Sequence, residues 1–206
     1  MNRRTPILLA AAGALLALSG CDKLREFAGG GKPAFKAIDI SGAEYARELS
    51  LPDADGKLRT LADFRGKVTL VFFGYTQCPD VCPTTLAELA AVKQALGADG
   101  ERVQGVFVSV DPARDTPPVL KAYMASFDPS FVALTGTPEQ IKRTAQGFKV
   151  FYAQVPGAAE GSYTVDHTAG TYVFDTLGRV RLFVRYGAPA DELTHDLKQL
   201  LAEAAG

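Results

Sequence analysis

Mostly apolar runs alternate along the chain with amphipathic segments. Residues 68–75 (VTLVFFGY) and 103–110 (VQGVFVSV) are typical of strands that are covered on both faces of a sheet. After the first run, leucines and alanines recur at helical spacing until Gly97, where we expect the helix to end. This alternation predicts an α/β fold in which helices flank a mixed central sheet.

The other hydrophobic patterns predict shorter elements. Residues 48–61 place an Asp-Gly turn between two short strands, so we expect an N-terminal β-hairpin. The pattern at 171–184 predicts a second hairpin around Gly178. The remaining predicted elements are a helix that ends near Phe127, a strand at 131–136, a helix that begins at Pro138, a short edge strand at 149–155 and a closing helix over 191–205.

The first 20 residues have the pattern of an export signal. A basic start, Met1–Arg4, precedes the uncharged apolar run 7–18, which is well short of the roughly 20 residues of a membrane-spanning helix. The run ends in Leu-Ser-Gly-Cys, which resembles the lipobox of bacterial lipoproteins and implies cleavage before Cys21 and acylation of that residue. The alternative is an uncleaved membrane anchor. We expect a lipoprotein signal peptide over 1–20.

The same pattern divides the rest of the chain and predicts its compartment. We expect the lipidated Cys21 and a flexible tether over 21–36, followed by one domain over 37–206. In enterobacterial lipoproteins, an aspartate such as Asp22 after the lipidated cysteine implies retention at the inner membrane. The predicted location is therefore the periplasmic face of the bacterial inner membrane, with a lipid anchor. A formal net charge of −1 gives no reason to expect a nucleic-acid partner.

The chain contains three cysteines, and lipid on Cys21 leaves Cys78 and Cys82 as a pair. In an oxidising compartment, such a pair persists as thiols only if it is metallated or actively reduced. Pro83 suits a first helical turn, so we expect Cys82 at the helix N-cap, where free amides and the helix dipole favour a thiolate. The pair lies just beyond the predicted strand at 68–75, at the sheet edge where chemistry gathers in α/β folds.

The spacing of the two cysteines leaves three roles open, namely a structural bridge, a redox pair and two metal ligands. A bridge that closes about five residues would stabilise the fold by only roughly 2 kcal/mol, so we consider it the weakest candidate. Positions i and i+4 of a helix hold their Cβ atoms about 5–6 Å apart, whereas a disulfide needs about 3.5–4.5 Å. An ion between two sulfurs therefore suits this spacing as well as a redox disulfide does.

The position of one histidine favours the interpretation that the two cysteines are metal ligands. The chain has two histidines, and we expect His195, in the closing helix, to be a solvated surface residue. His167 lies within 166–170, which we expect to be a loop directly before the second hairpin. In a thioredoxin-like sheet this loop lies near the cysteine helix and normally carries a proline, which is missing here. The imidazole of His167 is therefore a candidate third ligand.

Three segments together resemble the Sco/SenC family, and the similarity extends from about Leu51 to the closing helix. The segments are FGYTQCPDVCPTTL, SVDPARDTP and VDHTAGTYVFD. The resemblance implies a thioredoxin-like fold, with copper, as Cu(I), Cu(II) or both, on Cys78, Cys82 and His167. It also implies a membrane-anchored metallochaperone that delivers copper to the CuA site of cytochrome c oxidase. The implied partners are the oxidase subunit that carries CuA and, further, a periplasmic copper donor or thiol reductant.

Other chemistries use the same sulfurs. The main alternative is a thiol–disulfide oxidoreductase in which Cys78 and Cys82 reduce the cysteines of the oxidase copper site. Peroxide reduction or redox sensing is a third class. Zinc is a further candidate ion, because two cysteines and one histidine with a water form a known open zinc site.

Four acidic residues lie close to the predicted site. Asp80 and Asp166 neighbour the ligands, where each could tune the charge of the site or simply be exposed. Asp111 and Asp115 follow a predicted strand and could orient a ligand or meet a partner. We favour a simpler interpretation, in which Asp111 begins a turn and Asp115 or Thr116 caps the next helix.

Overall fold

The computed structural model describes residues 34–204. The predicted signal peptide, the lipidated Cys21 and the tether up to residue 33 lie outside the described residues. Among the residues that are described, no helix is both long enough and apolar enough to cross a membrane.

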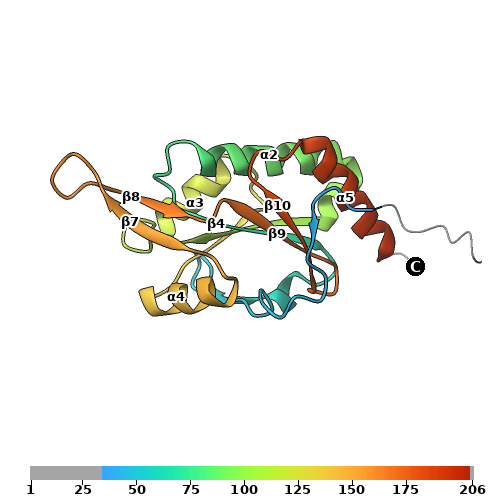
Figure 1. The fold of residues 1–206 in the computed structure, drawn as a ribbon, viewed down its shortest axis with the longest axis horizontal. Coiled ribbons are helices and arrows are strands. Elements are labelled where there is room, and N and C mark those ends of the chain that lie inside the picture. The colour runs from blue at the N-terminus through green and yellow to red at the C-terminus, as the bar shows by residue number, and fades with distance from the viewer. Residues whose placement is uncertain (1–33, 205–206) are drawn as a thin grey trace, which may run out of the picture. The chain divides into compact units, whose positions relative to one another are not determined.

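A six-stranded mixed sheet forms the centre of the described chain (Figure 1). Its order is β1-β10-β9-β4-β5-β6, in which β4, β5 and β6 are parallel and the other neighbours antiparallel. The strands are β1 (Ile38–Asp39), β4 (Val68–Gly74), β5 (Val103–Ser109), β6 (Val132–Leu134), β9 (Gly170–Phe174) and β10 (Val180–Arg185). The arrangement confirms the predicted α/β, thioredoxin-like fold and the second hairpin.

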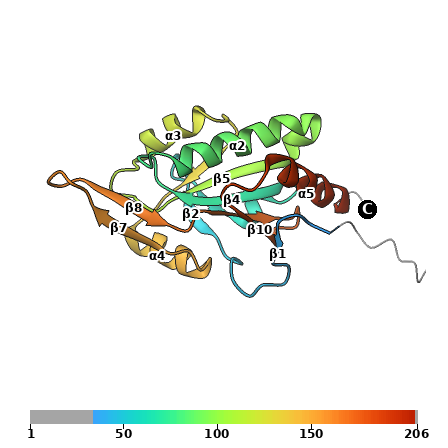
Figure 2. The same ribbon diagram turned by 45° about the horizontal axis from the view of Figure 1, so that its top comes forward.

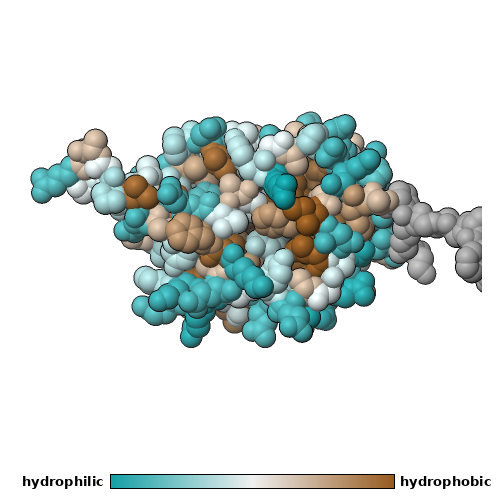
Figure 3. All heavy atoms as spheres, viewed as in Figure 1, coloured by the Kyte–Doolittle hydropathy of each residue, from teal (hydrophilic) through white to brown (hydrophobic). Residues whose placement is uncertain are grey.

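Helices cover both faces of this sheet (Figure 1, Figure 2). Helices α2 (Val81–Ala95), α3 (Pro117–Ala125) and α5 (Ala190–Glu203) lie on one face, and α4 (Pro138–Gly147) lies on the other. Two short 3₁₀ helices, η1 (Leu61–Phe64) and η2 (Gly97–Arg102), complete the set. The α4 helix buries Ile141 and Ala145, and its opposite side is hydrophilic (Figure 3). This amphipathic pattern is expected of a helix with one face on a sheet.

The core is rich in aromatic side chains on both faces of the sheet. All residues of β4 and β5 are buried, because helices cover both of their faces. The ring centroids of Phe73 and Phe148 lie 5.1 Å apart, and the Tyr172 hydroxyl donates a hydrogen bond to the Phe148 carbonyl. Strand β4, which leads into the cysteine segment, therefore lies in the buried core.

Two strands near the start of the described chain form the predicted N-terminal hairpin. They are β2 (Ser50–Pro52) and β3 (Leu58–Thr60), which pair antiparallel. Gly56 has φ +79° in the turn, a conformation that glycine adopts without strain. The Asp53 carboxylate accepts two backbone N–H hydrogen bonds across the same turn.

A second small hairpin differs from the prediction. Strands β7 (Tyr152–Pro156) and β8 (Tyr163–His167) pair only with each other, and they project away from the central sheet (Figure 1, Figure 2). The short edge strand expected at 149–155 is present as β7, but it belongs to this separate two-stranded sheet and not to the central sheet. Strand β8 was not predicted, and His167 is its last residue rather than part of a loop.

Candidate metal centre

Three side chains from two separate parts of the chain converge beyond the end of β4. Cys78 lies in the turn before α2, Cys82 lies in α2, and His167 lies at the end of β8. One potential ligand atom from each residue lies within 4.8 Å of the other two. Cys82 is fully buried, whereas Cys78 and His167 are partly exposed, so the group has an open side. Over residues 34–204, this is the one group of three or more potential metal ligands of this kind.

The backbone fixes the turn that carries the cysteines. The Cys78 N–H donates to the Tyr75 carbonyl at 3.2 Å, and the Cys82 N–H points to the Cys78 sulfur at 3.4 Å. The N-cap of α2 is Asp80, so the predicted placement of Cys82 at the N-cap is wrong, and Cys82 lies within the first turn. The N-cap is the residue that leaves the helical conformation, and Asp80 does so, with φ −143° and ψ −67°.

Burial governs the ionisation of Cys82. Loss of hydration raises the pKa of the Cys82 thiol far above its ordinary value, against a smaller opposing effect of a backbone hydrogen bond at Tyr75. Burial therefore opposes the helix end, which is expected to favour the thiolate. A bound metal ion would have to displace the thiol proton.

A glycine makes room for the buried sulfur. A Cβ added at Gly74 would lie 2.7 Å from the Cys82 sulfur and 2.9 Å from the ring of Phe107. Such contacts are closer than real Cβ atoms tolerate. Cys82 is therefore part of the packed core as well as of the candidate site.

The imidazole of His167 is oriented by its neighbours. Its Nε2 lies 3.4 Å from the Cys82 sulfur, and its Nδ1 lies 3.2 Å from the Thr168 carbonyl, to which it can donate. That hydrogen bond leaves the Nε2 lone pair free to face the sulfurs. The ring packs edge-on against Phe72 and Tyr75, which lie in and directly after β4, the strand that leads to the cysteines. Burial lowers the pKa of His167, outweighing the Thr168 carbonyl and the Asp166 charge, so the neutral ligand form prevails.

Asp115 supports the cysteine turn and does not cap α3. Its carboxylate accepts hydrogen bonds from the Thr76 N–H, from the Thr76 hydroxyl at 2.6 Å and from the Ser109 hydroxyl at 2.6 Å. The N-cap of α3 is Thr116, whose side chain makes no capping hydrogen bond. Of the two predicted caps, Thr116 therefore holds the N-cap position, and Asp115 does not, because it is turned inward and is almost fully buried. It joins the ends of β4 and β5.

Asp111 does begin a turn, as predicted, but its side chain has a further role. The backbone N–H groups of Arg114 and Asp115 donate to the Asp111 carbonyl, which closes the turn. The buried carboxylate accepts hydrogen bonds from Arg114 Nε and, at 2.8 Å, from the Tyr163 hydroxyl. Asp111 therefore contacts the hairpin that carries His167.

The other candidate residues lie at the margin. Asp80 and Asp166 are exposed; Asp80 is 3.4 Å from the Thr84 hydroxyl, and the charge of Asp166 works to raise the pKa of His167. His195 lies in α5 with its Nδ1 at 3.0 Å from the Asp196 carboxylate and is partly exposed, so it takes no part in the cluster.

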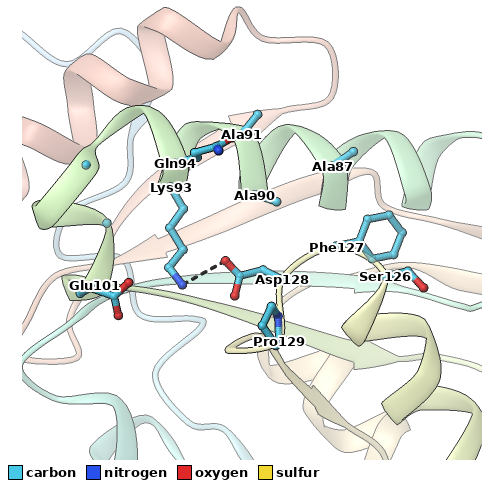
Figure 4. A pocket seen from close by; sticks show the side chains of 12 residues that line it. Ala87, Ala90, Ala91, Lys93, Gln94, Glu101, Ser126, Phe127, Asp128 and Pro129 are labelled. Atoms are coloured by element: carbon cyan, nitrogen blue, oxygen red, sulfur yellow. Dashed lines mark hydrogen bonds and ion pairs between the residues drawn. The ribbon is translucent and has the colours of Figure 1, made fainter.

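A wide groove of about 640 Å³ lies elsewhere, between α2 and the loop that follows α3 (Figure 4). Lys93 reaches into this groove and forms an ion pair with Asp128 at 3.0 Å, and its Nζ also donates to the Ser130 hydroxyl. No cysteine or histidine lines the groove. It is therefore separate from the candidate metal centre.

Comparison with known proteins agrees with the fold and the motif. The SCO1/SenC family model matches residues 39–202. This chain belongs to the SCO1/SenC family. A SCO2-like protein of Rickettsia felis is 39% identical over 151 residues, which cover 72% of this chain and 74% of the relative.

Two solved SCO1/SenC relatives have the same fold. Bradyrhizobium japonicum ScoI with copper bound is 42% identical, with a TM-score of 0.68 over 79% of this chain and 99% of the relative. BsSco, a member of the Sco family of cytochrome c oxidase assembly proteins, has a disulfide switch. It is 26% identical, with a TM-score of 0.61 over 81% of this chain and 98% of the relative.

The structure brings the three predicted ligands together, and metal binding by them stays a prediction. Sequence reasoning did not single out Thr76, Ser109 or Tyr163, which anchor the two sides of the site. Thr76 and Tyr163 bond to residues 39 and 52 positions away. The sequence did offer one signal for the strand that carries His167, because Tyr163, Val165 and His167 occupy alternate positions, as side chains on one face of a strand do.

Proposed function

We propose that this chain is a copper-binding metallochaperone that delivers copper to the CuA site of cytochrome c oxidase. The convergence of Cys78, Cys82 and His167 within 4.8 Å carries the proposal. Thiolate is a soft ligand and imidazole a borderline one; together they suit Cu(I) and can also hold Cu(II). The same function is supported by the copper bound to the Bradyrhizobium relative and by BsSco, which belongs to the Sco family of cytochrome c oxidase assembly proteins.

Each residue of the site has a definite part in this proposal. Cys82 gives up its proton to become a thiolate inside the core, and Cys78 supplies the second sulfur at the surface. His167 offers Nε2 while its Nδ1–H bonds to the Thr168 carbonyl. Because Cys78 and His167 are partly exposed, a ligand from an acceptor protein can approach from the open side. An ion on few ligands with one open side suits transfer to an acceptor.

A metal competition tests the assignment. The full-length chain, reduced and metal-free, would be titrated with Cu(I) against a chelator of known affinity and separately with Zn(II). We expect one copper per chain, held more tightly than zinc, and transfer of that copper to a metal-free CuA domain. Copper binding that persists unchanged in Cys78→Ala and in Cys82→Ala would contradict the proposal.

The proposed location is the periplasmic face of the bacterial inner membrane, through lipid on Cys21. The basic start, the short apolar run and the Leu-Ser-Gly-Cys sequence support it. We expect Cys21→Ala to move the protein from the detergent phase to the aqueous phase on phase separation, because acyl chains are the proposed anchor. Unchanged partition would show that lipid on Cys21 is not the anchor.

A second candidate function is thiol–disulfide exchange with the cysteines of the oxidase copper site. The proximity of the two sulfurs, and the disulfide switch of BsSco, favour it. In that reaction, the Cys78–Cys82 dithiol becomes a disulfide and passes two electrons and two protons to the partner disulfide, which becomes a dithiol. Exchange that continues in His167→Ala would support this function. No exchange with an oxidised CuA peptide would count against it.

A further inference from the structure

The ligand His167 lies on a hairpin that has no strand partner in the central sheet. Strand β8 pairs only with β7. Its side chains alternate, so Tyr163, Val165 and His167 share the face that packs inward, and Val165 is buried. The sheet holds the chain on one side of His167, because β9 begins three residues later at Gly170 and pairs with β4. The hairpin on the other side of His167 has no strand partner in the sheet, so its side-chain contacts have to hold it against the cysteine turn.

A group of such contacts lies at the other end of the same face, around Tyr163. The Tyr163 hydroxyl donates to an Asp111 carboxylate oxygen at 2.8 Å. The Tyr163 carbonyl accepts from Arg114 Nη1 at 2.9 Å, and the Arg114 guanidinium carbon lies 3.6 Å from the centroid of the Tyr163 ring. One residue of the hairpin is thus held through its hydroxyl, its backbone and its ring.

The partners of Tyr163 are themselves fixed to the cysteine side. Asp111 is almost fully buried and is paired with Arg114. Arg114 Nη1 also donates to the side-chain oxygen of Gln77 at 3.2 Å, and Gln77 directly precedes the ligand Cys78. The planar fork of a guanidinium can bond several acceptors at once, which a lysine ammonium cannot do in a fixed geometry. Arg114 therefore connects the two sides of the site.

We propose that Tyr163, Arg114 and Asp111 form a clamp that sets the distance between the His167 imidazole and the two thiolates. This inference rests on the proposed copper site. Tyr163 and His167 are four residues apart, about 13 Å along the strand, with the buried Val165 midway. The hairpin would pivot at Val165, so a movement at Tyr163 would also move His167. Plausible metal sites keep their ligand distances within about 0.2 Å of the usual values, so we expect even a small movement of His167 to weaken the third bond.

Two matched tyrosine substitutions test the clamp. Tyr163→Phe removes only the hydroxyl that bonds Asp111. Tyr152→Phe makes the same change directly opposite His167 on β7, where the hydroxyl has no hydrogen-bond partner among the described residues. The rate of copper loss from the loaded full-length chain to a chelator would be measured, with the thiolate-to-copper absorbance and the thermal midpoint recorded for each variant.

We expect Tyr163→Phe to lose copper about 10-fold faster and Arg114→Lys up to about 100-fold faster, as is typical when residues that orient a ligand are removed. Tyr152→Phe should match the parent. In a His167→Ala background, Tyr163→Phe should have no further effect, because the clamp acts through His167. That last comparison separates positioning from general destabilisation.

The possible failures are distinguishable. If the parent holds no copper, the proposed function and the clamp are both overturned. If the parent holds copper but Tyr163→Phe and Tyr152→Phe release it at the same rate, only the clamp is overturned. Equal effects of Tyr163→Phe with and without His167 also overturn the clamp, because the tyrosine would then act on the fold and not on the ligand.

Discussion

The cysteine side and the histidine side of the candidate metal centre are supported in different ways. Cys78 and Cys82 follow β4, a fully buried strand with hydrogen-bonded neighbours on both edges. His167 ends β8, a partly exposed strand whose one partner is β7. The first side belongs to the core, and the second is a projecting hairpin held by a few side chains. From this difference we expect the two sulfurs to be the fixed part of the site and the imidazole its adjustable part.

The largest expected effects are losses of copper affinity when one ligand is removed from each side. Cys82→Ala should abolish stoichiometric copper binding, because it removes one of only two soft anionic ligands. His167→Ala should leave copper bound by the two sulfurs, but with lower affinity. Loss of a residue that only orients a ligand typically lowers metal affinity by roughly 10–100-fold, and we expect loss of the ligand itself to lower it at least as much. Competition with a Cu(I) chelator measures both. A parent-like affinity in His167→Ala would remove the histidine side from the site.

A smaller effect tests how far the cysteine side belongs to the core. Gly74→Ala forces a Cβ against the Cys82 sulfur and the Phe107 ring, and we expect it to lower the free energy of unfolding by about 1–3 kcal/mol. Gly147→Ala in α4 meets no atom within 4 Å and is the matched control, with a neutral or slightly stabilising effect. Urea denaturation of the metal-free chain gives both values. Equal stability of the two variants would show that Cys82 is not tightly packed.

The smallest expected effect is on the pH dependence of stability, to which Asp115 and Asp175 should contribute in opposite directions. Burial raises the pKa of Asp115, outweighing its hydrogen bonds from Ser109 and Thr76. Its folded form thus binds a proton more tightly, and its contribution to stability is lost as the pH rises from about 3.9 through the folded pKa. For Asp175, burial alone would raise the pKa, but the hydrogen bonds and charge of Arg179 outweigh burial and lower it.

The stability contribution of Asp175 is therefore present above about pH 3.9 and is lost as the pH falls through its lowered folded pKa. The stability difference between parent and Asp115→Asn should shrink as the pH rises, whereas the difference for Asp175→Asn should grow. Urea midpoints of the metal-free chain at several pH values measure both. Parallel pH profiles for the two variants would contradict the burial of Asp115 beneath the cysteine turn.

The same contrast between the two sides explains what the sequence could predict. The buried strand at 68–75, the following helix and the cysteine pair leave strong local patterns, since a core strand is almost continuously apolar. Strand β8 is five residues long with polar side chains on its outer face, and it is too short for a firm pattern. Asp115 and Tyr163 bond to residues distant in the chain, and no local pattern records such partners.

The most direct test of a copper site completed from a separate hairpin is pulsed electron paramagnetic resonance on the Cu(II)-loaded full-length chain. The remote imidazole nitrogen of a bound histidine gives a characteristic coupling to the copper electron. We expect one such imidazole in the parent and none in His167→Ala, with copper still held by the two sulfurs. An absent coupling in the parent, or the same coupling in His167→Ala, would contradict the site of Cys78, Cys82 and His167.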